Sequence, residues 1–153
     1  MRRQCRGLTL IELMTVVALV ATISAFAAPG MQGFVAGQRV KAMATDLASD
    51  LVLARSEALK RQRNVTVTPV ASGWPGGWTV ASEGEVLSRR EPTNADLSVS
   101  GAPEAVTFNL HGRVLSPSGA VRIGIEAAAA SASRRCVELD ASGRARARQG
   151  ACA

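Results

Sequence analysis

The residues of this chain that could support catalysis are few, and their spacing argues against an enzyme. The single histidine, His111, has no Asp and Ser or Cys at a spacing typical of a catalytic triad. The sequence contains no phosphate-binding loop of the form GxxxxGK[ST]. Neither a CxxC nor an HxxxH spacing is present, so a metal site is not expected. We therefore predict a non-enzymatic protein without cofactor or metal.

A row of arginines near the C-terminus could bind an anion. From Gly143 to Arg148 the chain alternates arginine with alanine, and on an extended strand side chains two apart share a face about 7 Å apart. The predicted DNA-binding set is Arg144, Arg146 and Arg148, helped by Arg134 and Arg135. Guanidinium groups in a row suit successive phosphates of a nucleic-acid backbone, and nothing here would read base edges. Alternatively, these arginines are a solvated edge strand that discourages aggregation.

Glu12 is the other unusual residue, since it is the single charge in an otherwise almost wholly apolar stretch from Leu8 to Ala28. A helix of that length spans about 30 Å, the thickness of a bilayer core. The basic residues before it are Arg2, Arg3 and Arg6, which predict a cytoplasmic N-terminus and export of the chain beyond Ala28. A carboxylate in a bilayer is costly unless it finds a partner, so Glu12 indicates function.

Three interpretations of this stretch compete. It could be a secretory signal cleaved after Ala27, which would release a soluble domain, or a plain membrane anchor. The third rests on Arg6–Glu12, which resembles the type IV prepilin signature: a basic leader, a glycine at the cleavage site and a glutamate fifth in the mature chain. That resemblance implies cleavage between Gly7 and Leu8 by prepilin peptidase and N-methylation of Leu8.

The same resemblance implies roles for two further residues. Glu12 would pair with the terminal amine of a neighbouring subunit during filament assembly, because two charges too costly to bury singly are tolerated as a pair. Pro29 stands where many pilins carry a helix-bending proline. Removal of residues 1–7 lowers the basic residues from 18 to 15 against 12 acidic ones, a formal charge of +3.

Two cysteines, Cys136 and Cys152, remain after Cys5 leaves with the leader. A pair of cysteines in an exported domain most often forms a disulfide, which here would brace the arginine segment. Two unpaired thiols are the alternative. Two tryptophans, Trp74 and Trp78, could stack bases, although such residues more often pack on a sheet or helix.

The elements that position these residues follow from hydrophobic periodicity. An apolar stripe with helical spacing runs through Val40, Met43, Leu47, Leu51, Ala54 and Ala58. The helix is expected to end near residues 62–64, with Gly33 and Gly37 in its flexible or bent part. Strands are predicted at 65–68, 78–80, 85–88, 97–100, 106–110, 121–125 and 136–139. Residues 72–77 are interpreted as a turn, and 127–133 as a loop or weak strand connection.

Two further segments, 53–61 and Phe108–Arg113, resemble the GspH/FimT pseudopilin domain. The resemblance implies an α+β, type IV pilin-like fold: a long N-terminal helix, half membrane and half amphipathic, packed on an antiparallel β-domain. The expected organisation is a leader at 1–7, a transmembrane and assembly helix at 8–28, its amphipathic continuation at 29–63, and a periplasmic β-domain at 64–153. Gly143–Arg146 matches the GRxR motif of FimT-type minor pilins implicated in DNA uptake.

The expected protein is therefore a minor pilin or pseudopilin in the bacterial inner membrane, with a periplasmic C-terminal domain and a place at or near a filament tip. Its implied partners are other pilin subunits, prepilin peptidase, the assembly platform, membrane lipid and, by the arginine row, DNA without sequence preference. Three functions remain open. The first is a purely structural type II secretion pseudopilin that helps initiate or cap the filament, and the second is a type IV pilus subunit that binds DNA. The third is a secreted soluble domain released after Ala27.

Overall fold

The computed structural model describes residues 9–91 and 96–152, except for the side chains of 25–30 and 131–132. Within these ranges, one long helix, α1 (Leu10–Arg61), precedes nine strands and a short 3-10 helix, η1. The strands are β1 (Val65–Val70), β2 (Gly73–Ser82), β3 (Glu85–Arg90), β4 (Leu97–Ser100), β5 (Val106–Phe108), β6 (Val114–Ser116), β7 (Val121–Ala127), β8 (Arg135–Leu139) and β9 (Ala145–Gln149). Between β7 and β8 lies η1 (Ala128–Ser133).

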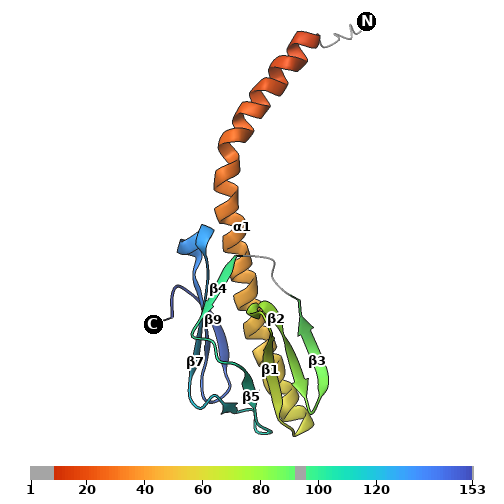
Figure 1. Ribbon diagram of the computed structural model, residues 1–153, viewed down its shortest axis with the longest axis vertical. Helices are drawn as coiled ribbons and strands as arrows, with labels where there is room; N and C mark the ends of the chain where they lie inside the picture. Colours follow the sequence, from red (N-terminus) through yellow and green to blue (C-terminus); the bar gives the residue numbers. More distant parts are fainter. Residues whose placement is uncertain (1–8, 92–95, 153) are drawn as a thin grey trace, which may run out of the picture.

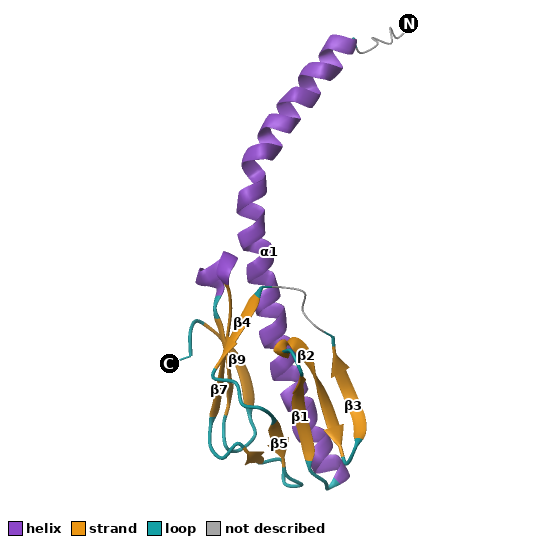
Figure 2. Cartoon of the chain, viewed as in Figure 1, coloured by secondary structure: helices purple, strands orange, loops and turns teal. Residues whose placement is uncertain are grey.

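The helix α1 extends far beyond the β-domain at its N-terminal end, whereas its C-terminal half is packed against the strands (Figure 1). The hydroxyl of Thr9 caps its start by accepting from the backbone N–H of Glu12 at 3.3 Å. Its end is marked by Gln62, which has a left-handed φ of 54°. The helix curves along its length (Figure 2) and remains helical through position 29. Gly7, Leu8 and the Pro29 side chain lie outside the described residues, so cleavage and bending there stay predictions.

Two antiparallel sheets pack along the same helix. The five-stranded sheet has the order β3-β2-β1-β5-β6, and the four-stranded sheet has the order β4-β7-β8-β9. The two sheets lie beside one another (Figure 1), and strands of both contact α1. The predicted α+β architecture, a long helix packed on an antiparallel β-domain, is therefore confirmed.

The core forms where the apolar stripe of α1 meets the inner faces of the sheets. All six residues of the predicted stripe, from Val40 to Ala58, are at most 1% exposed. From the sheets, the largest buried residues are Trp78, Phe108, Ile123, Ile125 and Leu139. Alternate residues of a strand face one side, which is why β7 buries Val121, Ile123 and Ile125. Trp74 and Trp78 are 5% and 1% exposed, so they pack in the core and offer no stacking platform.

A buried carboxylate links the helix to the first sheet. The Oδ2 atom of Asp50, in α1, accepts from Trp78 Nε1 at 2.9 Å and from the guanidinium of Arg90 at 3.1 and 3.2 Å. The Asp50 side chain is only 7% exposed. Because an unpaired buried charge is strongly destabilising, these three residues hold each other in place.

The structure corrects the predicted turn at 72–77. The turn lies at residues 71–72, and β2 begins at Gly73. The glycines that suggested a turn instead permit close strand contacts: a Cβ on Gly77 would lie 2.2 Å from the carbonyl oxygen of Arg90. Strand β6 was not among the predicted segments, whereas β9 covers most of the arginine–alanine stretch that the sequence suggested as an extended strand. Residues 128–133 form η1 where a loop or strand connection was expected.

Gly33 and Gly37 are also explained differently from the prediction. A Cβ on Gly33 would be 3.2 Å from the carbonyl oxygen of Ala129, and one on Gly37 would be 2.8 Å from the hydroxyl of Ser133. Both glycines therefore allow η1 to approach the α1 backbone closely. Their role in the described structure is packing, and the helix is continuous through them.

Candidate functional site: an arginine row on the second sheet

The β8–β9 hairpin places the C-terminal arginines on one face. In its register Leu139 is opposite Ala145, Glu138 opposite Arg146, and Cys136 opposite Arg148. Because side chains alternate along a strand, Arg144, Arg146 and Arg148 lie on the sheet face directed away from α1. All three are exposed, and β9 is the edge strand of its sheet. We call these three residues the arginine row.

Acidic neighbours partly neutralise the row. Arg144 Nε lies 3.5 Å from Asp140 Oδ2, and Arg148 Nη1 lies 3.4 Å from Glu138 Oε2. The two arginine side chains are 63% and 67% exposed, so these contacts are loose surface pairs. Within the described ranges, Arg146 forms no ion pair.

Arg122 belongs to the same face, although sequence reasoning did not single it out. It is exposed on β7 and pairs in register with Glu138, which places it on the other side of Glu138 from Arg146. The alternation Val121-Arg122-Ile123 was the signal that could have found it, because an arginine between two core residues of a strand must face outward.

The two arginines at the start of β8, Arg134 just before the strand and Arg135 as its first residue, are separated by the fold. Arg134 is exposed, and its Nε lies 2.7 Å from Oε2 of Glu126. Glu126 belongs to the outer face of the sheet, the one directed away from α1. Arg135 is opposite Ile125 in β7 and shares the inner face with it. Its Nε is buried without a hydrogen-bond partner in the described structure. Arg135 therefore does not join the arginine row, and Arg134 lies on its face but is paired.

A disulfide between Cys136 and Cys152, with Cα atoms 5.1 Å apart, ties the end of the chain to this face. Cys136 is 2% exposed because the tail covers it. A Cβ on Gly124 would be 3.9 Å from Cys152 Sγ, so the disulfide lies next to a residue of β7 that has no side chain. The disulfide braces the strand that carries the row.

The turn before the row is held by Asp140. Its Oδ1 accepts from the Ser142 hydroxyl at 2.5 Å and from the backbone N–H of Arg144 at 2.9 Å. These bonds stabilise the ionised carboxylate and lower the pKa of Asp140 from 3.8 to about 2, with the Ser142 hydroxyl as the largest cause. Asp140 therefore stays charged at neutral pH, and the start of the row is oriented by a turn.

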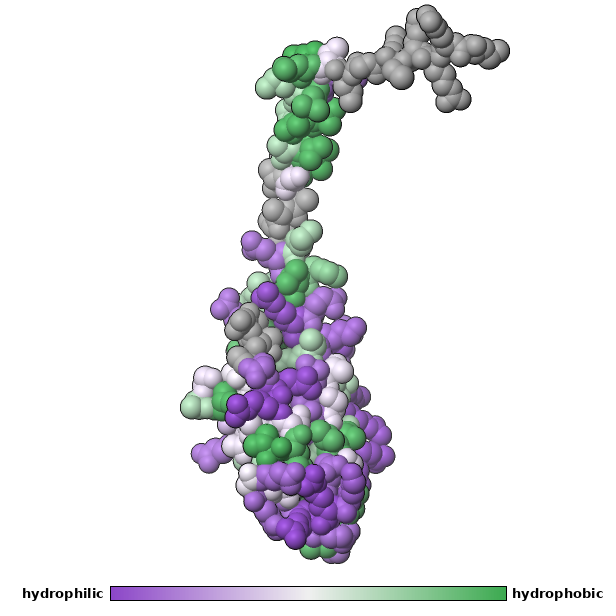
Figure 3. Space-filling model, turned by 90° about the vertical axis from the view of Figure 1, so that its right-hand side faces the viewer, coloured by the Kyte–Doolittle hydropathy of each residue, from purple (hydrophilic) through white to green (hydrophobic). Residues whose placement is uncertain are grey.

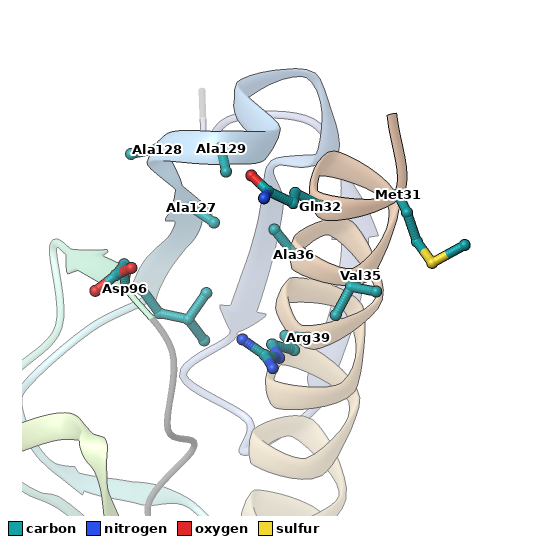
Figure 4. A pocket seen from close by; sticks show the side chains of 10 residues that line it. Met31, Gln32, Val35, Ala36, Arg39, Asp96, Ala127, Ala128 and Ala129 are labelled. Carbon is teal, nitrogen blue, oxygen red and sulfur yellow. The ribbon is translucent and has the colours of Figure 1, made fainter. Parts of the chain in front are cut away.

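A separate cavity of about 570 Å³ lies between α1, η1 and the start of β4 (Figure 4). Figure 4 shows Gln32 and Ala36 directed toward Ala127 and Ala129 across the gap, with Asp96 at its left side and Arg39 at its lower side. Among the described residues that line the cavity, Arg39 and Asp96 are the charged ones. The cavity is otherwise largely apolar and does not adjoin the arginine row.

His111 lies in the exposed β5–β6 turn, where its backbone N–H donates to Asn109 Oδ1 at 3.0 Å. In the part of the chain that the structure describes, no three potential ligands gather at a metal site.

The N-terminal part of α1 presents a second surface of functional interest. Its exposed side chains are largely hydrophobic (Figure 3), with Leu10, Ile11, Leu13 and Met14 all more than half exposed. Glu12 is exposed in the first turn of this helix. Among the helices described, none has a stretch both long and apolar enough to cross a membrane.

Comparison with known families identifies the chain. A family model described as type II transport protein GspH matches residues 43–143, which is most of the sequence. The chain belongs to the GspH family. A second model, the prokaryotic N-terminal methylation motif, matches residues 2–28 and so covers Gly7, Leu8 and Glu12. The comparison with curated proteins gave no match.

The GspH-family fold is also found in a solved structure from Pseudomonas aeruginosa, the type IV minor pilin FimU. Its two crystal forms match with TM-scores of 0.60 and 0.59, each at 20% sequence identity. The matches cover 71% and 74% of this chain and 91% and 89% of FimU. At this identity the likeness shows the fold. With the two family matches, it makes this protein a minor pilin or pseudopilin, a structural class that associates with other pilin subunits.

Proposed function

We propose that this GspH-family subunit binds DNA without sequence preference through its arginine row, as a minor pilin at or near the tip of a filament. The observation that carries the proposal is the position of Arg144, Arg146 and Arg148: one exposed face of an edge strand, directed away from α1. Phosphate contacts need accessible guanidinium groups and no base-reading groove. The hairpin of β8 and β9, which the disulfide braces, supplies these accessible guanidinium groups.

We further propose that the N-terminal segment is processed and assembled as in prepilins. Cleavage would fall between Gly7 and Leu8 by prepilin peptidase, and Leu8 would be N-methylated, as the matched methylation motif supports. Glu12 would then pair with the terminal amine of a neighbouring subunit, because a buried carboxylate needs a partner. The N-terminal segment would anchor the subunit in the inner membrane, with residues 64–153 in the periplasm.

The second candidate function is a structural type II secretion pseudopilin that binds no DNA. The observation that favours it is the pairing of Arg144 with Asp140 and of Arg148 with Glu138. If these pairs persist, the row is a balanced surface and offers little net attraction to phosphate.

DNA binding by the full mature chain in nonionic detergent separates the two. We would titrate salt with a labelled random-sequence duplex and compare Arg144→Ala plus Arg146→Ala with a charge-matched control, Arg39→Ala plus Arg89→Ala. The control residues are exposed and lie away from the row. Each lost phosphate contact should reduce the salt slope by about 0.9, so the row variant should lose about 1.8.

The control double variant, Arg39→Ala plus Arg89→Ala, should bind DNA with the same salt dependence as the unaltered chain. Equal loss in both double variants, or no salt-dependent binding of the unaltered chain at low salt, would leave the structural pseudopilin as the function.

Processing has its own test. Mass spectrometry of the mature N-terminus should find methylated Leu8, and Gly7→Arg should block its appearance. A mature chain that begins at Ala28 would contradict the prepilin assignment and restore the secreted-domain alternative.

A further inference from the structure

Two turns in this domain share one sequence pattern and one geometry. The β5–β6 turn is Asn109-Leu110-His111-Gly112-Arg113, and the β8–β9 turn is Asp140-Ala141-Ser142-Gly143-Arg144. In each, the Oδ1 atom of the first residue accepts from the backbone N–H of the arginine, at 3.0 and 2.9 Å. In each, the glycine N–H donates to the first residue's carbonyl, at 2.8 and 2.9 Å. Both turns thus present an arginine directly after the glycine.

The turns come from different sheets, yet their backbones touch. A Cβ on Gly143 would lie 2.2 Å from the carbonyl oxygen of Gly112, and Arg55 of α1 lies against both glycines. Successive Cα atoms are 3.8 Å apart, so the Cα atoms of Arg113 and Arg144 cannot be more than about 10 Å apart. An arginine side chain spans most of that distance.

The arginine side chains are not needed to form the turns. The Asx oxygen and the glycine, with φ of 69° and 83°, supply the turn geometry, and each arginine contributes only its backbone N–H. Arg113 is exposed, and within the described residues it forms no ion pair. Its neighbour Val114 packs on the core, so the backbone that carries Arg113 is held in place.

We propose that the DNA-binding surface continues from the arginine row onto Arg113, across the gap between the two sheets, with Arg113 and Arg144 contacting different phosphates of the DNA backbone. The row alone extends over about 14 Å. With Arg113 it reaches at most about 24 Å. Arg55, whose Nε is buried between the turns without a hydrogen-bond partner, adds positive charge beneath them. This inference rests on the proposed DNA-binding function.

The test uses the full mature chain in nonionic detergent with a labelled random-sequence duplex. The variants are Arg113→Ala, Arg144→Ala and the two combined, with Arg89→Ala as the control for loss of one exposed positive charge. Arg113→Ala should weaken binding about three- to fivefold at low salt and reduce the salt slope by about 0.9. The combined variant should lose about 1.8 in slope, because separate phosphates contribute additively.

A conservative variant shows that charge, and not the turn, is measured. Arg113→Lys should keep the salt slope of the unaltered chain, since lysine also neutralises one phosphate. Arg113→Ala should unfold at the same temperature as Arg89→Ala, because its backbone bonds remain.

The outcomes distinguish the two proposals. If Arg113→Ala binds like Arg89→Ala while Arg144→Ala is impaired, the extension onto Arg113 is wrong and the row remains. If Arg144→Ala also binds like Arg89→Ala, the proposed DNA-binding function itself fails.

Discussion

Arg90 and the arginine row show how differently the same side chain is used in the two sheets. In the first sheet, Arg90 donates to a buried carboxylate of α1 at 3.1 and 3.2 Å, and that carboxylate is 7% exposed. In the second, Arg144 and Arg148 lie 3.5 and 3.4 Å from carboxylates that are 46% and 34% exposed. A buried partner commits an arginine to structure, whereas an exposed partner can be exchanged for a ligand. The number of arginines in a sheet therefore does not indicate whether they stabilise the fold or are free to bind a ligand; their partners do.

The largest expected effect is a loss of stability when Asp50, the buried partner of Arg90, is replaced. Asp50→Ala leaves Trp78 Nε1 and the Arg90 guanidinium without their acceptor and should lower the free energy of unfolding by about 3 kcal/mol. Denaturant unfolding measures this loss. Asp46→Ala is the matched control, because Asp46 is 43% exposed and 3.8 Å from Arg90; it should cost less than about 0.5 kcal/mol. Equal losses in the two variants would remove the distinction between buried and exposed pairs.

The second-largest expected effect is a loss of stability when the close contact beneath the arginine row is disrupted by a substitution that removes no charge. Gly143→Ala puts a Cβ 2.2 Å from the Gly112 carbonyl oxygen at a φ of 83°, and should destabilise the domain by about 2 kcal/mol or more. Gly84→Ala, at a φ of 87° with open space around it, should cost only the conformational part, about 1 kcal/mol. Thermal unfolding compares them. A Gly143→Ala variant no less stable than Gly84→Ala would contradict the close contact between the two turns.

A smaller effect, on DNA affinity, is expected when the exposed acidic partner of the arginine row is removed. Glu138→Gln removes the partner of Arg148 and a negative charge opposite Arg146, so DNA affinity should rise about two- to threefold at low salt. Stability should change by less than about 0.5 kcal/mol. Glu57→Gln, which removes the partner of Arg61 on α1, is the control and should leave DNA affinity unchanged. A fall in affinity in Glu138→Gln would show that Glu138 orients the row.

The smallest expected effect is the titration of Asp140, which holds the turn at the start of the arginine row. The pKa of Asp140 is lowered to about 2 in the folded chain, against 3.8 ordinarily. Such a group stabilises the fold fully above its unfolded pKa, and this contribution is lost as the pH falls from about 4 toward about 2. Carboxyl NMR should show this pKa directly. Ser142→Ala removes the largest cause and should raise it toward 3.8; an unchanged pKa would exclude the hydroxyl as that cause.

Much of the architecture could be predicted from local pattern. The stripe from Val40 to Ala58 identified the buried face of α1, because a 3.6-residue period leaves only one face apolar. The prediction of a turn at residues 72–77 was wrong because glycine occurs in two kinds of place. It is common in turns, and it is also found where two backbones approach closely. Only contact with the Arg90 carbonyl decides that Gly77 serves the second use.

The candidate site shows the same division. The alternation of arginine and alanine from residue 144 to 148 predicted a shared face, since strand periodicity is local. Which face that is depends on pairing with β8, and this pairing turns Arg135 inward and adds Arg122 to the outer face. The alternation of β8 separates Arg135 from Arg134, because Arg135 shares a face with the buried Val137 and Leu139.

The sequence alone determined the family-level character of this protein: an apolar N-terminal stretch with one carboxylate, a matched methylation motif, and a GspH domain. Hydrophobic period and motif spacing are carried by neighbouring residues, so they are readable without the fold. Tertiary structure alone decided that Asp50 would hold Arg90 and Trp78, and that the turns ending in Gly112 and Gly143 would meet. These contacts join segments distant in sequence, and they form only once the two sheets pack on the same helix.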